Sequence, residues 1–184
     1  MRLTLAETEA HRREVLALFL DTFSDIAPTA VPMPHVDHLY RPAIAQVRDD
    51  TGALVASALT CVPQKAAGVA LLPPQMRPQG LSRAAERVSE LDLVAVQPDR
   101  RGQGVGQKMI EFLESVLVSR GVRTWFGCAT PDLDVAALRH FYARAGFKVL
   151  TEGQPLPPLG GQNWSVPFAE APAFYFWKKL RAAH

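Results

Sequence analysis

Residues 99–109 read DRRGQGVGQKM and place Gly102, Gly104 and Gly106 at alternate positions behind two arginines. The segment follows the apolar run LDLVAV at 91–96 and precedes a stretch with helical periodicity. Because ordered glycine costs backbone entropy, three of them indicate a loop whose backbone approaches something closely. The alternative is a tight turn with solubilising arginines, but such a turn needs only one or two glycines.

A strand, a glycine-rich turn and a helix N-terminus together favour anion binding. The first N–H groups of a helix lack intrahelical partners, and the helix dipole attracts negative charge there. Glycines leave these N–H groups open to phosphate oxygens. Arg100, Arg101 and Lys108 add positive charge on either side of the loop.

Three phosphate-binding spacings compete for this loop. The dinucleotide fingerprint G-x-G-x-x-G fails because Gly106 comes too soon after Gly104, and the G-x-x-x-x-G-K-[ST] loop fails at Gln107. The spacing R-x-x-G-x-G fits, with Arg101 as its first residue.

The rest of the chain alternates between strand and helix patterns. Apolar periodicity predicts strands over 2–7, 41–62 (two strands with a turn at 50–52), 87–96, 122–129, 147–152 and 173–180. It predicts helices over 11–23, 105–120 and 134–146, the first burying Val15, Leu18, Phe19, Thr22 and Phe23, the second Val105, Met109, Phe112, Leu113, Val116 and Leu117. Proline-rich stretches at 25–40, 63–84 and 153–172 are predicted to be irregular. The order in the second half implies a partly parallel sheet covered by helices.

Composition bounds the class of protein. At 184 residues, with 48% apolar and 21% charged side chains, the chain is expected to form one soluble domain over 1–184. A net charge of +2, with the basic residues dispersed, disfavours nucleic-acid binding. Cys61 and Cys128 have neither a disulfide pattern nor zinc spacing, so we expect reduced thiols and no metal. The N-terminal sequence has no signal-peptide core or membrane span, so a cytoplasmic location is expected.

The glycine loop and its surroundings resemble the GNAT superfamily of acyl-CoA-dependent N-acetyltransferases. ELDLVAVQPDRRGQGVGQKMIEFLE at 90–114 is similar to the family's fourth strand, pyrophosphate loop and third helix, and LRHFYARAGFKV at 138–149 to its last core helix. The similarity covers residues 90–149, within a cofactor-binding core of about 88–150. It implies a mixed α/β fold with a partly parallel central sheet flanked by helices and splayed between strands four and five.

The resemblance also implies a reaction. The family moves the acetyl group of acetyl-CoA to a primary amine by direct attack in a ternary complex, as a monomer or homodimer. By resemblance the cofactor-binding residues are Val94, Ala95, Val96, Arg101, Gly102, Gln103, Gly104, Val105, Gly106 and Gln107, with the Val96 N–H near the thioester oxygen. The alternative is a non-catalytic acyl-CoA-binding module that senses or regulates.

Two carboxylates are candidates for the base, since an alkylammonium with a pKa of about 10 must lose a proton before it attacks. Strand alternation places Leu91, Leu93 and Ala95 on one face and Glu90, Asp92, Val94 and Val96 on the other. Carboxylates on a central strand suggest a wet cleft. By resemblance Glu90 is the general base, and Asp92 is a second candidate for the base or an acceptor-binding group. Alternatively, both are solvated where the strand begins.

The leaving thiolate benefits from a proton donor. Tyr142 matches the family's tyrosine for this role, although its helical spacing also suits a packed core aromatic. Cys128 lies in an apolar strand without a nearby histidine, which disfavours a covalent acyl carrier. The family's asparagine seven residues before the tyrosine is replaced by Val135, and Asp134 beside it suits a helix N-cap.

The acceptor is not identified by the sequence. By resemblance its site is built from residues 24–40 and 153–172. Acidic and histidine side chains there that can contact an amine are Asp25, Asp37, Glu152, Glu170, His35 and His38; His140 is expected to be an exposed helix residue. A small amine, an antibiotic and a protein N-terminus all remain open.

Overall fold

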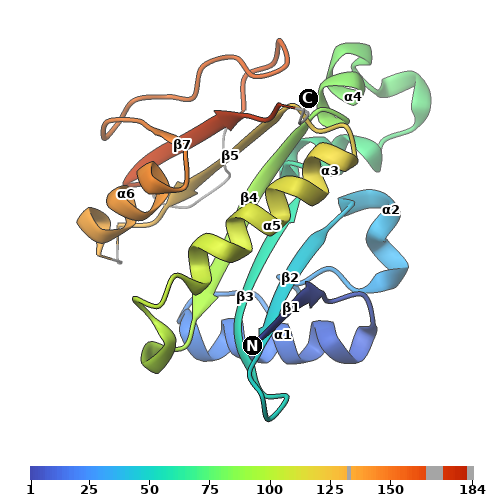
Figure 1. Ribbon diagram of the computed structural model, residues 1–184. Helices are drawn as coiled ribbons and strands as arrows, with labels where there is room; N and C mark the ends of the chain where they lie inside the picture. The colour runs from blue at the N-terminus through green and yellow to red at the C-terminus, as the bar shows by residue number, and fades with distance from the viewer. Residues whose placement is uncertain (132–133, 165–171, 182–184) are drawn as a thin grey trace.

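One seven-stranded sheet organises the chain, in the order β1-β2-β3-β4-β5-β7-β6 (Figure 1). The structure is a computed structural model, which describes residues 1–131, 134–164 and 172–181. The strands are β1 (Arg2–Leu5), β2 (Ala43–Arg48), β3 (Leu54–Cys61), β4 (Val88–Val96), β5 (Thr124–Ala129), β6 (Lys148–Val149) and β7 (Phe174–Lys179). Only β4 and β5 are parallel neighbours in this sheet, and the other pairs are antiparallel. The predicted mixed, partly parallel fold is confirmed.

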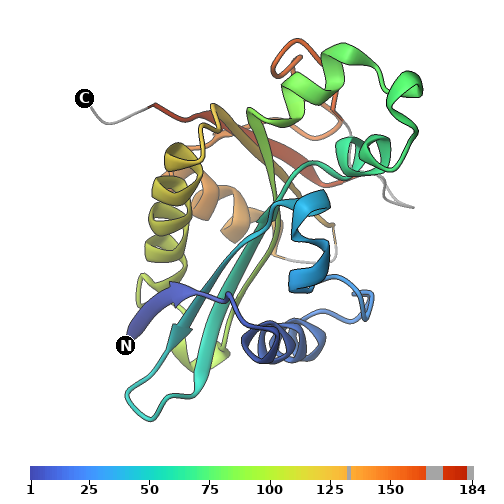
Figure 2. The ribbon, with the colours of Figure 1, turned by 90° about the vertical axis from the view of Figure 1, so that its right-hand side faces the viewer.

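Helices cover both faces of the sheet (Figure 2). The helices α5 (Val105–Ser119) and α6 (Val135–Arg144) lie on one face, while α1 (Glu9–Thr22) and α2 (Asp37–Tyr40) lie on the other. Short 3-10 turns occur in the connections at Pro34–Val36, Pro74–Met76 and Pro98–Arg100. Among the helices of the described residues, none is both long and apolar enough for a bilayer crossing.

The described buried side chains form a cluster on each face of the sheet and a further cluster beside α3 and α4, which includes Leu81, Phe126 and Trp164. Under α5 and α6 the core includes Met109, Leu113, Trp125 and Phe176, whereas under α1 it includes Phe19. The predicted buried stripe of α5 holds for Val105, Met109, Leu113 and Leu117, while Phe112 and Val116 are only partly buried.

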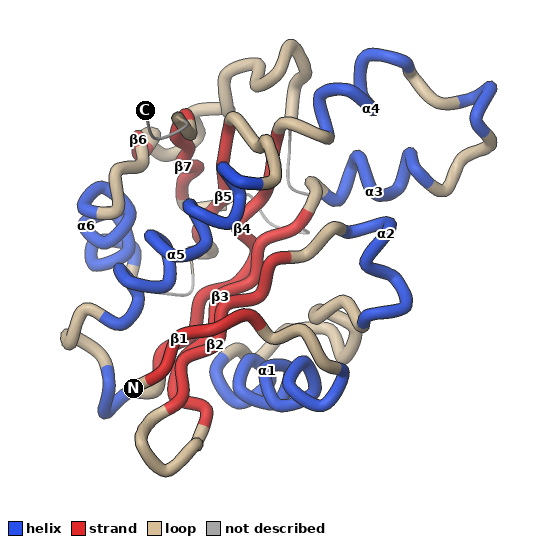
Figure 3. Tube along the Cα trace, turned by 45° about the vertical axis from the view of Figure 1, so that its right-hand side comes forward, coloured by secondary structure: helices blue, strands red, loops and turns tan. Residues whose placement is uncertain are grey.

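The stretch 63–84 was predicted to be irregular, and this prediction is wrong. It contains two helices, α3 (Gln64–Ala70) and α4 (Gln79–Ala85), which project beside the sheet (Figure 3). Pro63 and Pro78 stand at the N-caps of these helices, where proline's missing N–H costs nothing. The prolines therefore begin helices instead of interrupting them. The tip between α3 and α4 exposes Leu71, Leu72 and Met76.

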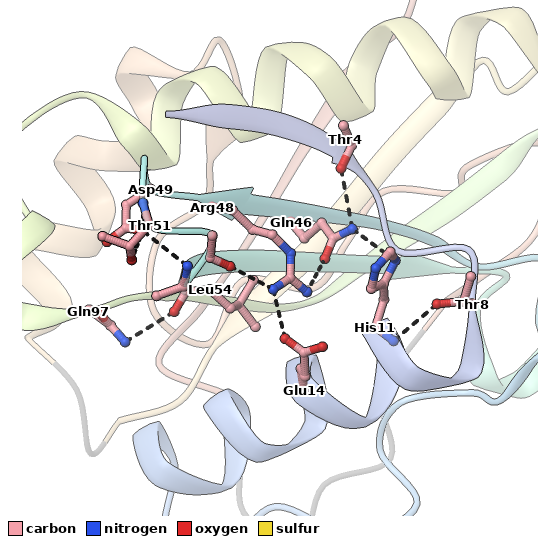
Figure 4. Close-up of polar contacts among 12 residues, drawn as sticks. Thr4, Thr8, His11, Glu14, Gln46, Arg48, Asp49, Thr51, Leu54 and Gln97 are labelled. Atoms are coloured by element: carbon pink, nitrogen blue, oxygen red, sulfur yellow. Dashed lines mark hydrogen bonds and ion pairs between the residues drawn. The ribbon is translucent and has the colours of Figure 1, made fainter.

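Polar contacts tie the first helix to the sheet (Figure 4). Arg48 of β2 pairs with Glu14 of α1 at 2.8 Å, and this pairing lowers the pKa of Glu14. The buried Gln46 side chain contacts Thr4 and His11, both at 3.3 Å. The predicted turn after β2 is also present, closed by hydrogen bonds to the Asp49 carboxylate.

Candidate active site

A β-bulge at Asp92 interrupts the pairing of β4 with β3. Leu91 lies opposite Thr60 and Leu93 opposite Leu59, so Asp92 has no partner of its own. One extra residue reverses the side-chain alternation. Leu91 therefore packs under α5, whereas Leu93 and Ala95 pack under α1. The prediction that these three side chains share a face is wrong for Leu91, because simple alternation does not account for a bulge. For the same reason the prediction that Glu90 shares a face with Val94 and Val96 is wrong, since Leu91 packs in one cluster with these two valines and its neighbour Glu90 points to the other face.

The sheet opens between β4 and β5 just beyond this bulge. Their parallel pairing ends at Leu91 and Gly127, although β4 continues to Val96. A Cβ on Gly127 would lie 2.8 Å from the Leu91 carbonyl oxygen and 2.5 Å from a Phe176 ring atom. Glycine is thus required where the strands part, and the predicted splay is confirmed.

The splay leaves the last residues of β4 with a free edge. The Gln97 N–H donates to the Val55 carbonyl of β3 at 3.0 Å, and antiparallel pairs alternate between bonded and non-bonded. Val94 and Val96 occupy the alternate positions, so their peptide groups point away from β3. In agreement, the Val96 carbonyl accepts a hydrogen bond from Arg101 Nε at 3.0 Å.

The three glycines of the loop meet two different needs. Gly102 and Gly104 have φ angles of 73° and 75°, in the left-handed region that side chains disfavour. Gly106 lies within α5, where an added Cβ would come 3.0 Å from the Phe141 ring of α6. Two glycines therefore shape the loop, and the third lets α6 approach the first turn of α5.

A cleft of about 680 Å³ lies where the glycine loop, the end of β4 and α6 meet. All the predicted cofactor-binding residues except Gln103 line it. Gln103 instead donates from its side chain to the Asp99 carbonyl at 2.9 Å. Gly104 is the N-cap of α5 and offers no side chain to the helix, so the first-turn N–H groups face this cleft without a side-chain cap. Lys108 is exposed and outside the lining.

Residues that the sequence did not single out for the cosubstrate complete the cleft. Thr22 and Phe23 reach it from the end of α1, and five side chains of α6 line it: Ala137, Leu138, His140, Phe141 and Arg144. His140 is exposed as expected, but it lies in the cleft wall. The i, i+3, i+4, i+7 spacing of Ala137, His140, Phe141 and Arg144 was a signal that these four share a face. Asp134 caps α6 by accepting from the Ala137 N–H at 3.0 Å, as predicted.

Glu90 is buried close to the bulge, with 4% of its surface exposed. Its Oε2 accepts from the backbone N–H of Gln64, the first residue of α3, at 3.3 Å. Burial raises the pKa of Glu90 to about 7 despite this hydrogen bond. The carboxyl can therefore take up or release a proton near neutral pH.

Asp92 is exposed at the bulge, and Glu90 and Cys61 lie near its carboxyl group. Desolvation of this carboxyl group and the nearby charge of Glu90 raise the pKa of Asp92, and a hydrogen bond with Cys61 partly offsets the rise. The two carboxylates thus influence one another. The alternative that both are simply solvated does not hold for Glu90.

Tyr142 is largely buried, and its ring stacks on Phe176 with centroids 3.7 Å apart and an interplanar angle of 15°. Burial raises the pKa of Tyr142, so the phenol stays protonated. Its neighbour Phe141 lines the cleft, but Tyr142 is not in the lining. Burial also raises the pKa of the Cys128 and Cys61 thiols, which disfavours either as a nucleophile.

The residues that were predicted to contact the acceptor lie in different environments. Asp37 is engaged by the buried Arg12 guanidinium, which pairs with both of its carboxylate oxygens and with the Ala6 and Pro32 carbonyls. Asp25, Glu152, His35 and His38 are exposed, and Glu170 lies outside the described residues. No group of three His, Cys, Asp or Glu side chains suited to a metal ion occurs in residues 1–131, 134–164 and 172–181.

A model of a known protein family agrees with this architecture. The family model described as "Acetyltransferase (GNAT) family" matches residues 12–147. The chain belongs to the GNAT acetyltransferase family. No curated protein sequence matches this GNAT chain.

Solved structures with a similar fold include several acetyltransferases. A GNAT-family acetyltransferase from Staphylococcus aureus Mu50 superposes with a TM-score of 0.64 at 11% identity, covering 98% of this chain and 100% of that one. An aminoglycoside 6'-N-acetyltransferase complexed with coenzyme A gives 0.63 at 14% identity, covering 100% and 99%. A ribosomal-protein-alanine N-acetyltransferase from Brucella melitensis gives 0.60 at 18% identity, covering 98% and 100%. At these identities the likeness establishes the GNAT fold alone.

Proposed function

We propose that this GNAT protein transfers the acetyl group of acetyl-CoA to a primary amine by direct attack within a ternary complex. The observation that carries the proposal is one cleft that joins the free edge of β4 to the uncapped N-terminus of α5, with a buried carboxyl at the start of the same strand. A cytoplasmic location and a monomeric or homodimeric state stay predictions from the sequence.

The residues present fit coenzyme A. The first turn of α5 offers N–H groups and the positive end of a helix dipole to a diphosphate, and Arg101 lies beside them. The outward peptide groups of Val94 and Val96 can pair with the amides of an extended pantetheine arm, as a strand pairs with a sheet edge. Because the Val96 carbonyl already accepts from Arg101, its N–H is the group left for the thioester oxygen. A donor there would stabilise the negative charge that grows during attack.

Glu90 is the base in this proposal. A carboxyl with a pKa of about 7 is matched to proton transfer at neutral pH, and it accepts the amine's proton directly or through water. Asp92 lies nearer the surface, where its carboxyl group can accept a hydrogen bond from the incoming amine.

Tyr142 is the acid in this proposal. Its raised pKa keeps the proton available for the departing thiolate, and it packs near the point where β4 and β5 part, since its stacking partner Phe176 also covers Gly127. Val135 stands where the family has an asparagine, so one contact to the cosubstrate is lost, but the Tyr142 hydroxyl group is still present.

The acceptor class is an amine, and the fold does not narrow it further. Enzymes named for an aminoglycoside and for a ribosomal-protein alanine have similar folds. A non-catalytic acyl-CoA sensor is the alternative, but a sensor would not need a buried carboxyl of raised pKa on the strand whose end lines the cleft.

Release of CoA from acetyl-CoA, measured against a panel of small amines, aminoglycosides and peptides, tests the proposal. We expect turnover with at least one amine class. Tight acetyl-CoA binding without turnover on any amine would favour the sensor.

A further inference from the structure

Two basic side chains of α6 face the cleft without a protein partner. His140 and Arg144 are four residues apart, so they lie on one face of the helix, and both are exposed and line the cleft. Neither forms an ion pair within the part of the chain that the structure describes.

The arginines across the cleft belong to the glycine loop and the 3-10 turn before it, and both have contacts there, although the buried Nε of Arg100 has no hydrogen-bond partner. Arg100 lies 3.2 Å from Asp99 and 3.8 Å from Asp49, and Arg101 donates to the Val96 carbonyl. Asp134 is the acidic residue among the described lining residues, and its carboxylate caps α6. The α6 pair therefore forms a second cationic region, separate from the glycine loop.

This region lies close to the first turn of α5. The Cβ position of Gly106 is 3.0 Å from the Phe141 ring, and Arg144 is one turn beyond Phe141, about 5 Å further along α6. An anion attached to the same ligand as a diphosphate on α5 would thus come within reach of Arg144.

Building on the proposed function, we propose that Arg144 and His140 bind the 3′-phosphate of coenzyme A and make the enzyme prefer CoA to its 3′-dephospho form. Coenzyme A carries a diphosphate and, separately, a phosphomonoester on its ribose. The α5 N-terminus accounts for the first group but not for the second. A guanidinium donates two parallel hydrogen bonds to a phosphate, and a histidine one turn away adds a third donor.

Isothermal titration of CoA and 3′-dephospho-CoA into four proteins tests this inference. The proteins are the wild type, Arg144→Gln, His140→Gln and the control Lys148→Gln, which removes one positive charge from an exposed β6 residue outside the cleft. We expect the wild type to bind CoA about tenfold more tightly than dephospho-CoA. Arg144→Gln should abolish most of this preference while changing the dephospho-CoA affinity less than about twofold, His140→Gln should reduce it partly, and Lys148→Gln should retain it.

Equal wild-type affinities for the two ligands would overturn the inference and leave the proposed function intact. An Arg144→Gln variant that loses the same factor for both ligands would also overturn it, since that result assigns Arg144 to the diphosphate. A wild type that binds neither ligand would instead contradict the proposed function itself.

Discussion

The Cβ position of Gly106 in α5 lies 3.0 Å from Cε2 of Phe141 in α6, so an aromatic ring occupies the space that a side chain would take. Gly104, two residues earlier, has open space around its Cβ position but a φ of 75°. Neighbouring glycines of one loop are thus required for different physical reasons.

This difference predicts different rescue behaviour. Gly106→Ala should lower the free energy of unfolding by about 1 kcal/mol and weaken CoA binding, because the ring of Phe141 must move. Phe141→Leu should recover part of the unfolding free energy in the double variant. Gly104→Ala should lower the free energy of unfolding by a similar amount through backbone strain, and Phe141→Leu should not restore it. Chemical denaturation of the single and double variants measures how strongly each glycine substitution is coupled to Phe141→Leu. Equal coupling for Gly106→Ala and Gly104→Ala would contradict the packing explanation.

The pH–rate profile tests the role of Glu90. In the wild type kcat/KM should rise with pH and level off above a pKa of about 7, as Glu90 loses its proton. Glu90→Gln should lower the rate about 100-fold near neutral pH, with the gap narrowing as the free amine becomes abundant at higher pH. An unchanged profile in the variant would remove Glu90 from the mechanism.

Glu90 also predicts how stability depends on pH. Its pKa is raised from 4.5 to about 7 on folding, so between these values the folded state holds a proton that the unfolded state has lost. Wild-type stability should therefore fall as pH rises through this window, by on the order of 3 kcal/mol. Glu90→Gln should lose less stability than the wild type over this window, with a remaining fall from Asp92, whose pKa burial also raises, and Asp25→Asn, which removes an exposed carboxylate, should keep the full fall. Urea denaturation at pH 5 and pH 8 compares them, and a parallel fall in Glu90→Gln would contradict the assignment.

Tyr142→Phe separates the hydroxyl from the ring. Phenylalanine preserves the stack on Phe176, so thermal stability should change little, whereas kcat should fall about 10- to 100-fold with the acetyl-CoA KM nearly unchanged. Phe176→Leu serves as the comparison, because it disturbs packing and should lower stability as well as rate. Near-normal turnover in Tyr142→Phe would show that Tyr142 is a core aromatic only.

The Arg12–Asp37 ion pair is expected to stabilise the segment after α1. Arg12 is 5% exposed, so Asp37→Asn leaves a buried guanidinium without its charged partner and should destabilise the protein by about 2 kcal/mol. Asp25→Asn in the same segment should be within about 0.5 kcal/mol of the wild type. Thermal unfolding measures both, and equal effects would contradict a structural role for Asp37.

Local sequence patterns predicted much of this molecule. Glycine spacing located the loop between β4 and α5, and apolar periodicity located the core strands and the helices α1, α5 and α6. These features depend on residues close together in the chain. The cap at Asp134 was predictable for the same reason.

Features that depend on distant residues were missed. The bulge at Asp92 reflects how β4 pairs with β3, and apolar alternation carried no sign of it. The prolines of 63–84 resembled a loop because their helix-starting role depends on the packing of α3 and α4. Which side of α6 faces the cleft, with His140 and Arg144, depends on the packing of Phe141 against Gly106, which are far apart in the sequence.

The most direct test of the account is an amide-resolved NMR titration of the protein with CoA. The account predicts saturable shifts concentrated in the N–H groups of residues 101–107, with further shifts at Val94 and Val96. Absence of binding, or binding that leaves the amides of this loop unperturbed, would contradict it.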